Sequence, residues 1–339
     1  MLGLLLLFGG VLAIGALASG GDDGESAEDT DGASPNSPIP GATDGPDLLI
    51  GGAGDDLIDA LGGDDSVQGG DGVDTILGGS GDDDLNGGLA PDLINAGPGA
   101  DTIRGGDGDD LLLAGIDDDV IFGGPGDDVI DGFDGNDIAN AGPGDDLIDG
   151  GAGDDTLLAG LGNDFVAGGA GQDSLDGFDG NDILLGEGGA DLLQGGAGND
   201  VLFGGSDLET LFGTSTTQVA DLEDGVSDTL DGGAGDDFLG LGAGDVVTGG
   251  SGADAFGLDV GIVPETQTAV TRITDFTPGE DVFTVDFGQG VAETADQVAA
   301  RQTVTADGVL ISFDADQSQD VLLAGLTQVL GSDSFIVST

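Results

Sequence analysis

Aspartate recurs at every ninth position along much of this 339-residue chain, which contains 68 acidic residues and only three basic ones. Chance would break so long a run early, because charged residues of both signs make up only 21% of the chain. A fixed pitch of carboxylates suggests chemistry based on oxygen atoms, such as cation binding or catalysis by paired acids. The run consists of Asp47, Asp56, Asp65, Asp74, Asp83, Asp92, Asp101, Asp110, Asp119, Asp128, Asp137, Asp146, Asp155, Asp164, Asp173, Asp182, Asp191 and Asp200.

The residues around each aspartate follow the pattern GGxGxDxUx, where U is a large aliphatic residue; residues 51–59 read GGAGDDLID and 195–203 read GGAGNDVLF. The segment x-U-x predicts a short strand with U pointing inward. The six residues before it predict a turn, where glycine adopts positive φ and lets backbone carbonyls crowd together. Two such units complete one coil, so the chain is predicted to wind into a flattened parallel solenoid around an aliphatic stack.

Aspartate carboxylates and backbone carbonyls are the hard oxygen ligands that calcium prefers. The chain has no His and no Cys, which excludes the usual transition-metal sites and the H-E-x-x-H zinc motif of proteases. The paired carboxylates are all explained by the repeat, so no pair stands out as a glycosidase site. A net charge of -65 disfavours binding to nucleic acid. We therefore expect a calcium-binding protein that is not an enzyme.

The pattern resembles the RTX, or haemolysin-type, calcium-binding nonapeptide repeat, and residues 42–212 match it without insertion or deletion. The resemblance implies a right-handed parallel β-roll in which the turns of repeats n and n+2 stack. It also implies calcium ions between these turns, held by carbonyls of the glycine-rich positions and by the sixth-position aspartates. Carried over to this sequence, one edge of the roll begins Asp56, Asp74, Asp92 and the other begins Asp65, Asp83, Asp101.

The register breaks at residues 213–222, which we interpret as a loop insertion between the long roll and a second short roll at 223–257. The second roll supplies further candidate calcium ligands, Asp228, Asp237 and Asp254.

Several units depart from the repeat pattern. Asp245 arrives one residue early, so its role as a ligand stays open. Ala90 and Asp117 replace the fourth-position glycine, and Glu209 replaces the aspartate. At these units the alternative is a structural turn without calcium.

The charge balance makes calcium a condition of folding. Stacked turns lie about 5 Å apart, where two like charges repel by roughly 0.8 kcal/mol even in water. Summed along two edges, this repulsion rivals the stability of a typical domain. We therefore expect the chain to be expanded in the absence of cations. Calcium binding and folding would then occur together, and the free energy of binding would supply the free energy of folding. The alternative of a disordered acidic tail does not account for the strict register.

Strand-like sequence replaces the repeats over residues 258–339 and predicts a β domain that caps the roll. The segment ITDFTPGEDVFTVDF resembles the region that follows the repeats in serralysin-type secreted proteins. The final residues, 333–339, resemble the uncleaved C-terminal signal of type I secretion. This resemblance implies a type I secretion apparatus as a partner.

The amino-terminal segment 1–18 is apolar and predicts a signal peptide or a retained anchor, although no Lys or Arg precedes it. Residues 19–41 then form an acidic flexible linker. Either interpretation places the roll outside the cytoplasm. We therefore expect a secreted calcium-binding protein with a structural or matrix role. The alternative is a cell-surface-tethered module for adhesion or self-association, with the roll as a calcium-stiffened stalk.

Overall fold

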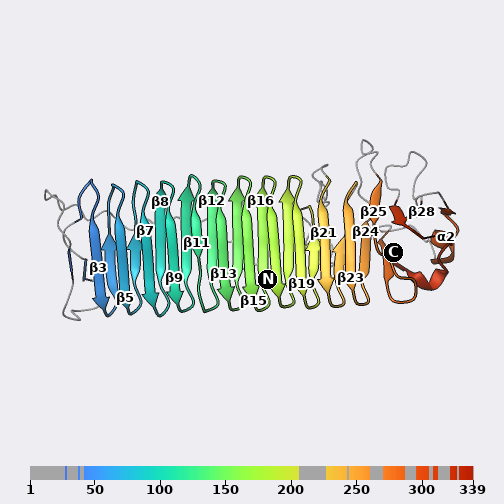
Figure 1. Ribbon diagram of the computed structural model, residues 1–339, viewed down its shortest axis with the longest axis horizontal. Helices are drawn as coiled ribbons and strands as arrows, with labels where there is room; N and C mark the ends of the chain where they lie inside the picture. Colours follow the sequence, from blue (N-terminus) through green and yellow to red (C-terminus); the bar gives the residue numbers. More distant parts are fainter. Residues whose placement is uncertain are drawn as a thin grey trace.

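The computed structural model describes residues 27–28, 37–38, 42–205, 227–242, 244–259, 270–286, 295–304, 308–311, 321–326 and 328–338. They form an elongated solenoid of two stacked sheets that ends in a β cap (Figure 1). The predicted all-β roll is confirmed, and the cap adds the short helix α2 (Ala295–Ala299) and the 3-10 turn η1 (Ser332–Ser334). None of the helices in this described part is long and apolar enough to cross a membrane.

Sheet A contains the odd-numbered strands of the roll and the antiparallel strands of the cap. Its strands, in spatial order, are β1 (Ala27–Glu28), β3 (Leu48–Ala53), β5 (Ser66–Asp71), β7 (Asp84–Leu89), β9 (Thr102–Asp107), β11 (Val120–Phe122), β13 (Ile138–Pro143), β15 (Thr156–Leu161), β17 (Ser174–Asp179), β19 (Leu192–Ala197), β21 (Thr229–Ala234), β23 (Val246–Ser251), β25 (Thr271–Ile273), β29 (Val321–Ala324), β28 (Gly308–Ile311) and β27 (Gln302–Val304).

Sheet B contains the even-numbered strands other than β28 and is parallel throughout. Its strands, in spatial order, are β2 (Ser37–Pro38), β4 (Asp56–Asp59), β6 (Thr75–Leu77), β8 (Leu93–Pro98), β10 (Leu111–Ile116), β12 (Val129–Asp134), β14 (Leu147–Ala152), β16 (Phe165–Ala170), β18 (Ile183–Gly188), β20 (Val201–Phe203), β22 (Phe238–Gly240), β24 (Ala255–Asp259), β26 (Val282–Asp286) and β30 (Phe335–Ser338).

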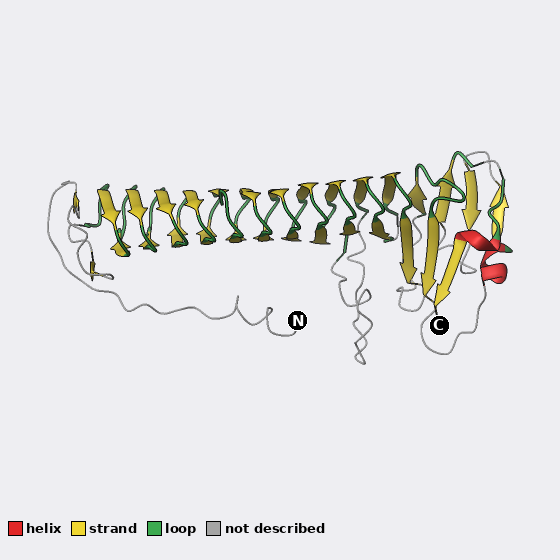
Figure 2. Cartoon of the chain, turned by 90° about the horizontal axis from the view of Figure 1, so that it is seen from below, coloured by secondary structure: helices red, strands yellow, loops and turns green. Residues whose placement is uncertain are grey.

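The predicted coil of two nonapeptides is confirmed by the strand register. Leu49 of β3 lies opposite Val67 of β5, and Ile148 of β14 lies opposite Val166 of β16, each 18 residues further along the chain. Successive nonapeptides therefore alternate between the two sheets, which Figure 2 shows as two layers of strands joined by loops. This alternation sends each turn to the opposite edge of the roll from the one before it.

The aliphatic residue two positions after each aspartate forms the core, as predicted. Ile148 is fully buried between the sheets, while its neighbours Leu147 and Asp149 point outward and stay partly exposed. Burial of such a side chain contributes roughly 1.5–3 kcal/mol. Even the small Ala139 is only 1% exposed, so the stack passes through this repeat unbroken.

The prediction of two separate rolls is wrong. β19 pairs directly with β21 through Leu193 and Leu230, and β20 pairs with β22 through Leu202 and Leu239. The repeats before and after the break keep the register that each sheet requires, so a single roll runs through. The predicted loop at 213–222 and Glu209 lie outside the described residues.

The amino-terminal linker prediction also needs correction at two points. The two-residue strand β1 pairs with Leu49 and Ile50 at the start of sheet A, and β2 pairs with Asp56 and Leu57 at the start of sheet B. The first coil offers unpaired backbone groups at both sheet edges, and these short strands satisfy some of them. The predicted apolar segment 1–18 lies outside the described residues.

The predicted cap is confirmed, and it continues both sheets. β25 extends sheet A beyond β23, and β26 extends sheet B beyond β24. Aromatic rings cover the end of the aliphatic stack: Phe256 lies 5.7 Å from Phe276, and Phe283 lies 6.1 Å from Phe335, between ring centroids. The candidate secretion signal is part of this cap, because β30 pairs with β26.

Candidate metal centre

The sixth-position aspartates lie where each turn enters its strand, and their burial is the main feature of the site. Every predicted ligand, from Asp47 to Asp254, is at most 8% exposed. A carboxylate is rarely so well buried without a partner, because burial strips it of water. The repeat therefore places two rows of carboxylates inside the edges of the roll.

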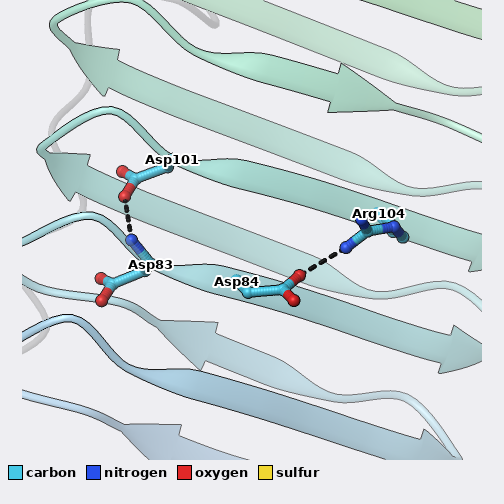
Figure 3. Close-up of polar contacts among 4 residues, drawn as sticks. All are labelled: Asp83, Asp84, Asp101 and Arg104. Carbon is cyan, nitrogen blue, oxygen red and sulfur yellow. Dashed lines mark hydrogen bonds and ion pairs between the residues drawn. The ribbon is translucent and has the colours of Figure 1, made fainter. Parts of the chain in front are cut away.

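A hydrogen-bonded ladder joins the aspartates along each edge. The N–H of Asp83 donates to Oδ1 of Asp101 at 2.7 Å, as Figure 3 shows. The ladder of one edge runs through Asp47, Asp65, Asp83, Asp101, Asp119, Asp137, Asp155, Asp173, Asp191, Asp228 and Asp245. The ladder of the other edge runs through Asp56, Asp74, Asp92, Asp110, Asp128, Asp146, Asp164, Asp182, Asp200, Asp237, Asp254 and Asp281.

The second carboxylate oxygen has no such partner along most of the two ladders. Oδ2 is buried and accepts no hydrogen bond in a set that spans both edges. This set is Asp65, Asp74, Asp83, Asp92, Asp101, Asp110, Asp119, Asp128, Asp137, Asp146, Asp155, Asp164, Asp173, Asp182, Asp200 and Asp237. Because a buried anionic oxygen without a donor is costly, a regular row of them indicates positions where a cation fits.

Backbone oxygens converge on the same points. A Cβ atom added to Gly150 would lie 2.5 Å from Oδ2 of Asp155 and 2.6 Å from the carbonyl oxygen of Gly168 on the next turn. On the opposite edge, a Cβ on Gly177 would lie 2.5 Å from both Oδ2 of Asp182 and the carbonyl oxygen of Gly195. In these two repeats the first-position glycine leaves room for one carboxylate and one carbonyl oxygen to face a shared point. This donor set suits calcium.

Side chains alone do not complete a metal shell in the described part of the chain, where no three acidic residues gather into a ready-made cluster. The carbonyl oxygens of the turns must therefore supply much of the coordination. Whether a carbonyl oxygen points toward the ion depends on the backbone conformation of the turn. Glycine adopts the conformations that the turn needs, which explains why glycines recur in the same repeat as the aspartate.

Burial also controls the charge state of the ladders. The pKa of Asp92, Asp101 and Asp128 is raised to about 7. Loss of solvent is the main cause, the hydrogen bond from the backbone N–H of the preceding turn opposes the rise, and neighbouring carboxylates of the same edge contribute to it. Asp137 and Asp146 rise to about 6, chiefly through burial. The ionised form is thus disfavoured unless a cation lies beside it.

The ends of the ladders are built differently. Oδ2 of Asp245 accepts the N–H of Gly242 at 2.6 Å, and Oδ2 of Asp281 accepts the N–H of Thr277 at 2.6 Å. At the amino-terminal end, Oδ2 of Asp47 accepts the N–H and the hydroxyl of Thr43. Backbone N–H groups therefore occupy Oδ2 of Asp245 and Asp281, the oxygen that would otherwise face a cation, and this closes each row.

Asp281 was missed by sequence reasoning, although its spacing held a signal. It lies 27 residues after Asp254, three nonapeptide lengths, and it opens the tripeptide Asp281-Val282-Phe283. Phe283 is fully buried, as the aliphatic residue of a repeat would be. In this part of the cap the chain keeps the aspartate and the inward-pointing residue of the repeat but not its glycines.

The fifth-position acids form hydrogen bonds of their own between successive turns of one edge. The N–H of Asp145 donates to Oδ1 of Asp127 at 2.9 Å, and the N–H of Asn163 donates to Oδ1 of Asp145 at 2.8 Å. These exposed side chains form a second ladder that points toward the carboxyl end of the roll. Asn163 and Asn181 continue it without charge, since an amide oxygen also accepts.

The decayed units keep the geometry of the repeat. Ala90 and Asp117 both adopt φ of 82°, the left-handed conformation that glycine adopts elsewhere. Asp92 and Asp119, which follow them, still donate along their ladders and still bury an unpaired Oδ2. The structural-turn alternative therefore has no geometric support at these two units.

Comparison with known proteins follows the same repeat. The family model described as RTX calcium-binding nonapeptide repeat matches overlapping segments across residues 42–215 and again at 227–245. No curated protein gives a significant match.

Two solved structures are similar in part. One is the solution structure of the AlgE6R3 subunit from the Azotobacter vinelandii mannuronan C5-epimerase, 22% identical over 56% of this chain and 78% of that chain, with a TM-score of 0.22. Another is the extracellular lipase LipA from Serratia marcescens, 15% identical over 92% of this chain and 42% of that chain, with a TM-score of 0.19. The repeats, their register and their matching family model together show that this chain belongs to the RTX calcium-binding nonapeptide repeat family, whose repeats bind multiple calcium ions.

Proposed function

We propose that the sixth-position aspartates hold the calcium ions of the roll and that these ions fold the chain outside the cytoplasm. The observation that carries the proposal is the row of buried Oδ2 atoms, several of which, such as those of Asp155 and Asp182, face a carbonyl oxygen of the adjoining turn. Bound calcium would supply the positive charge that these oxygens lack. Asp47, Asp56, Asp191, Asp228 and Asp254 belong to the same ladders and complete the proposed ligand set.

Adjacent acids on one turn provide the test. Asp155 is a proposed ligand, whereas its neighbour Asp154 is exposed and accepts the N–H of Gln172 at 2.8 Å. Equilibrium dialysis of the folded protein should show fewer bound calcium ions for Asp155→Ala and an unchanged number for Asp154→Ala. Equal losses in the two variants would show that calcium is held by general negative charge and not by the ladder.

For the biological role we propose a secreted structural or matrix protein without enzymatic activity. The absence of His and Cys from the sequence and the assignment of its regular carboxylates to the repeat support this role. Export would use either the apolar segment 1–18 or a type I apparatus that reads residues 333–339.

A tethered adhesion or self-association module is the second candidate, favoured by the elongated shape of the roll and by the apolar segment that precedes it. Mass spectrometry of the mature amino terminus, combined with cell fractionation, separates the two candidates. Retention of residues 1–18 in a membrane fraction supports the tether. Their loss and a soluble extracellular product support secretion.

A further inference from the structure

The interruption of the repeat register falls within a single turn of the roll. Gly204 follows β20 as the first residue of this turn, and Asp228 ends it immediately before β21. The N–H of Asp191 donates to Oδ1 of Asp228 at 2.9 Å across 37 residues, instead of the 18 that separate most ladder neighbours. We call this boundary the seam. The first portion of the roll, residues 42–205, precedes it, and the second portion, the described residues from 227 onward, follows it.

The two sheets cross the seam without loss of pairing. β19 and β21 form five residue pairs, as many as β15 and β17 form within the first portion. In the core, Leu202 of β20 lies opposite Leu239 of β22, and both side chains are fully buried. Without the second portion, the coil of β19 and β20 would end in unpaired backbone groups and an open aliphatic stack.

Oxygen atoms of both portions converge at the seam. Oδ2 of Asp200, in the first portion, is buried and accepts no hydrogen bond. A Cβ atom added to Gly195 would lie 2.5 Å from this oxygen and 2.6 Å from the carbonyl oxygen of Gly232, which belongs to the second portion. On the opposite edge, the carboxylate of Asp228 lies against Gly204 of the first portion. The calcium position proposed for Asp200 is therefore completed only where the two portions meet.

An aromatic contact also crosses the seam. Phe203 of β20 points out of the core, yet it is only 8% exposed, and its ring centroid lies 5.8 Å from that of Phe238 in β22. The same ring lies over Gly240 of β22, where an added Cβ atom would overlap it. Such aromatic pairs stabilise a contact beyond the area that they bury. The two portions are therefore joined on the outside of sheet B as well as in the core.

We propose that the seam is an interface in its own right, at which calcium joins the two portions of the roll independently of the chain between them. Sheet pairing, the shared calcium position and the Phe203–Phe238 contact are all made by residues of the two portions. The chain between positions 205 and 227 then acts as a tether that raises the effective concentration of the second portion. The partner that fits the open end of β19 and β20 is the second portion of the same chain.

Calcium is the condition for this association because the seam brings carboxylates together. The ladders place Asp191 beside Asp228 on one edge and Asp200 beside Asp237 on the other. Without cations, these like charges repel across the seam. The two portions should therefore separate when calcium is removed and the tether is cut.

A cut chain tests the proposal. A protease recognition sequence inserted after residue 213 of the full chain allows cleavage in chelator, after which calcium is restored and sedimentation equilibrium measures the mass of the particle. We expect one particle with the mass of the whole chain in calcium and two separate pieces in chelator. The inference rests on the calcium-dependent fold proposed above, so circular dichroism of the uncut chain is recorded in the same two conditions.

Matched variants locate the interaction at the seam. Asp200→Ala and Phe203→Ala should each raise the dissociation constant of the cut pieces about tenfold at fixed calcium. Asp236→Ala should leave it unchanged, because this exposed carboxylate accepts the N–H of Ala253 within the second portion. Phe122→Ala removes a 41% exposed ring far from the seam and should also leave it unchanged.

The outcomes separate this inference from the proposed function. Pieces that stay apart at saturating calcium, while the uncut chain gains β structure, would overturn the seam alone. An uncut chain that gains no β structure with calcium would contradict the proposed function. Equal weakening by Asp200→Ala and Asp236→Ala would overturn the seam in favour of a general charge effect. A particle of twice the mass of the whole chain would overturn the assignment of the second portion to its own copy.

Discussion

Single residues in this roll act through hydrogen bonds that run in two opposite directions. At position six, the carboxylate of a later turn accepts the N–H of the earlier one, as Asp155 does from Asp137 at 2.7 Å. At position five, the side chain of an earlier turn accepts the N–H of a later one, as Asp127 does from Asp145. Each turn is therefore fixed to its neighbours on both sides, while one oxygen of the buried acid stays available for calcium.

Coupling between two aspartates tests the edge arrangement. Asp137→Ala and Asp155→Ala alter adjacent turns of one edge, so their effects on the calcium midpoint of folding should be non-additive by about 1 kcal/mol. Asp137→Ala with Asp146→Ala alters opposite edges and should be nearly additive. Calcium titrations of the three single and two double variants measure both coupling energies, and equal coupling in the two pairs would contradict the assignment of edges.

The position-five ladder predicts a difference between two substitutions of one residue. Asp127→Asn keeps the oxygen that accepts the N–H of Asp145, whereas Asp127→Ala removes it and should cost about 0.5–1 kcal/mol of unfolding free energy at this exposed site. Denaturant unfolding at fixed calcium measures the difference. If alanine and asparagine prove equivalent, the ladder does not stabilise the roll.

The raised pKa values predict a response to pH in the absence of calcium. Ionisation of Asp92, Asp101 and Asp128 opposes folding, because their pKa is about 7 in the fold and near 3.8 in an unfolded chain. This penalty is absent below pH 3.8 and grows until the pH passes 7. Chelated protein should therefore contain more β structure at pH 5 than at pH 8, as circular dichroism would show. Equal or lower β content at pH 5 would contradict the proposed burial of the ladders.

At the scale of elements, the cap determines how the solenoid ends. β30 supplies the last strand of sheet B, and Phe335 is 5% exposed beside Phe283. The neighbouring Ile336 is 53% exposed. The same short segment therefore combines an inward residue that completes the fold with an outward residue that is accessible from solvent.

Phe335→Ala should destabilise the cap by about 3–5 kcal/mol and raise the calcium concentration needed for folding, because it leaves a cavity against Phe283. Ile336→Ser changes the same strand on its outer side and should leave the calcium midpoint unchanged. Calcium titrations followed by circular dichroism compare them. A shift of equal size in both variants would show that the contact between Phe335 and Phe283 is not what closes the roll.

Most of the repeat could be predicted from sequence, because the pitch of nine fixes strand, turn and inward residue locally. The pairing of β19 with β21 could not, since it depends on how the chain re-enters both sheets after the register breaks. Likewise, β1 and β2 pair at open sheet edges that local sequence does not reveal. At the site, the buried aspartates were predicted. The ladder ends at Asp245 and Asp281 were not, because they depend on the local turn conformation that points the N–H groups of Gly242 and Thr277 at these carboxylates.

At the scale of the whole molecule, the chain has a net charge of -65, and the edges of its narrow solenoid carry two rows of buried carboxylates. The aliphatic stack favours the coiled form, whereas repulsion and desolvation along both edges oppose it. Bound calcium offsets both the repulsion and the desolvation, because it supplies positive charge at the points where Oδ2 and carbonyl oxygens meet. Folding of the roll is therefore expected to be cooperative with calcium along its full length.

Circular dichroism of the full chain in chelator, in millimolar magnesium and in millimolar calcium tests this central claim most directly. We predict little β structure in chelator and a cooperative gain with calcium. Magnesium should fail, because it requires a smaller octahedral shell and gives up water reluctantly. Equal β content in chelator and in calcium would contradict the claim that the ions fold the roll.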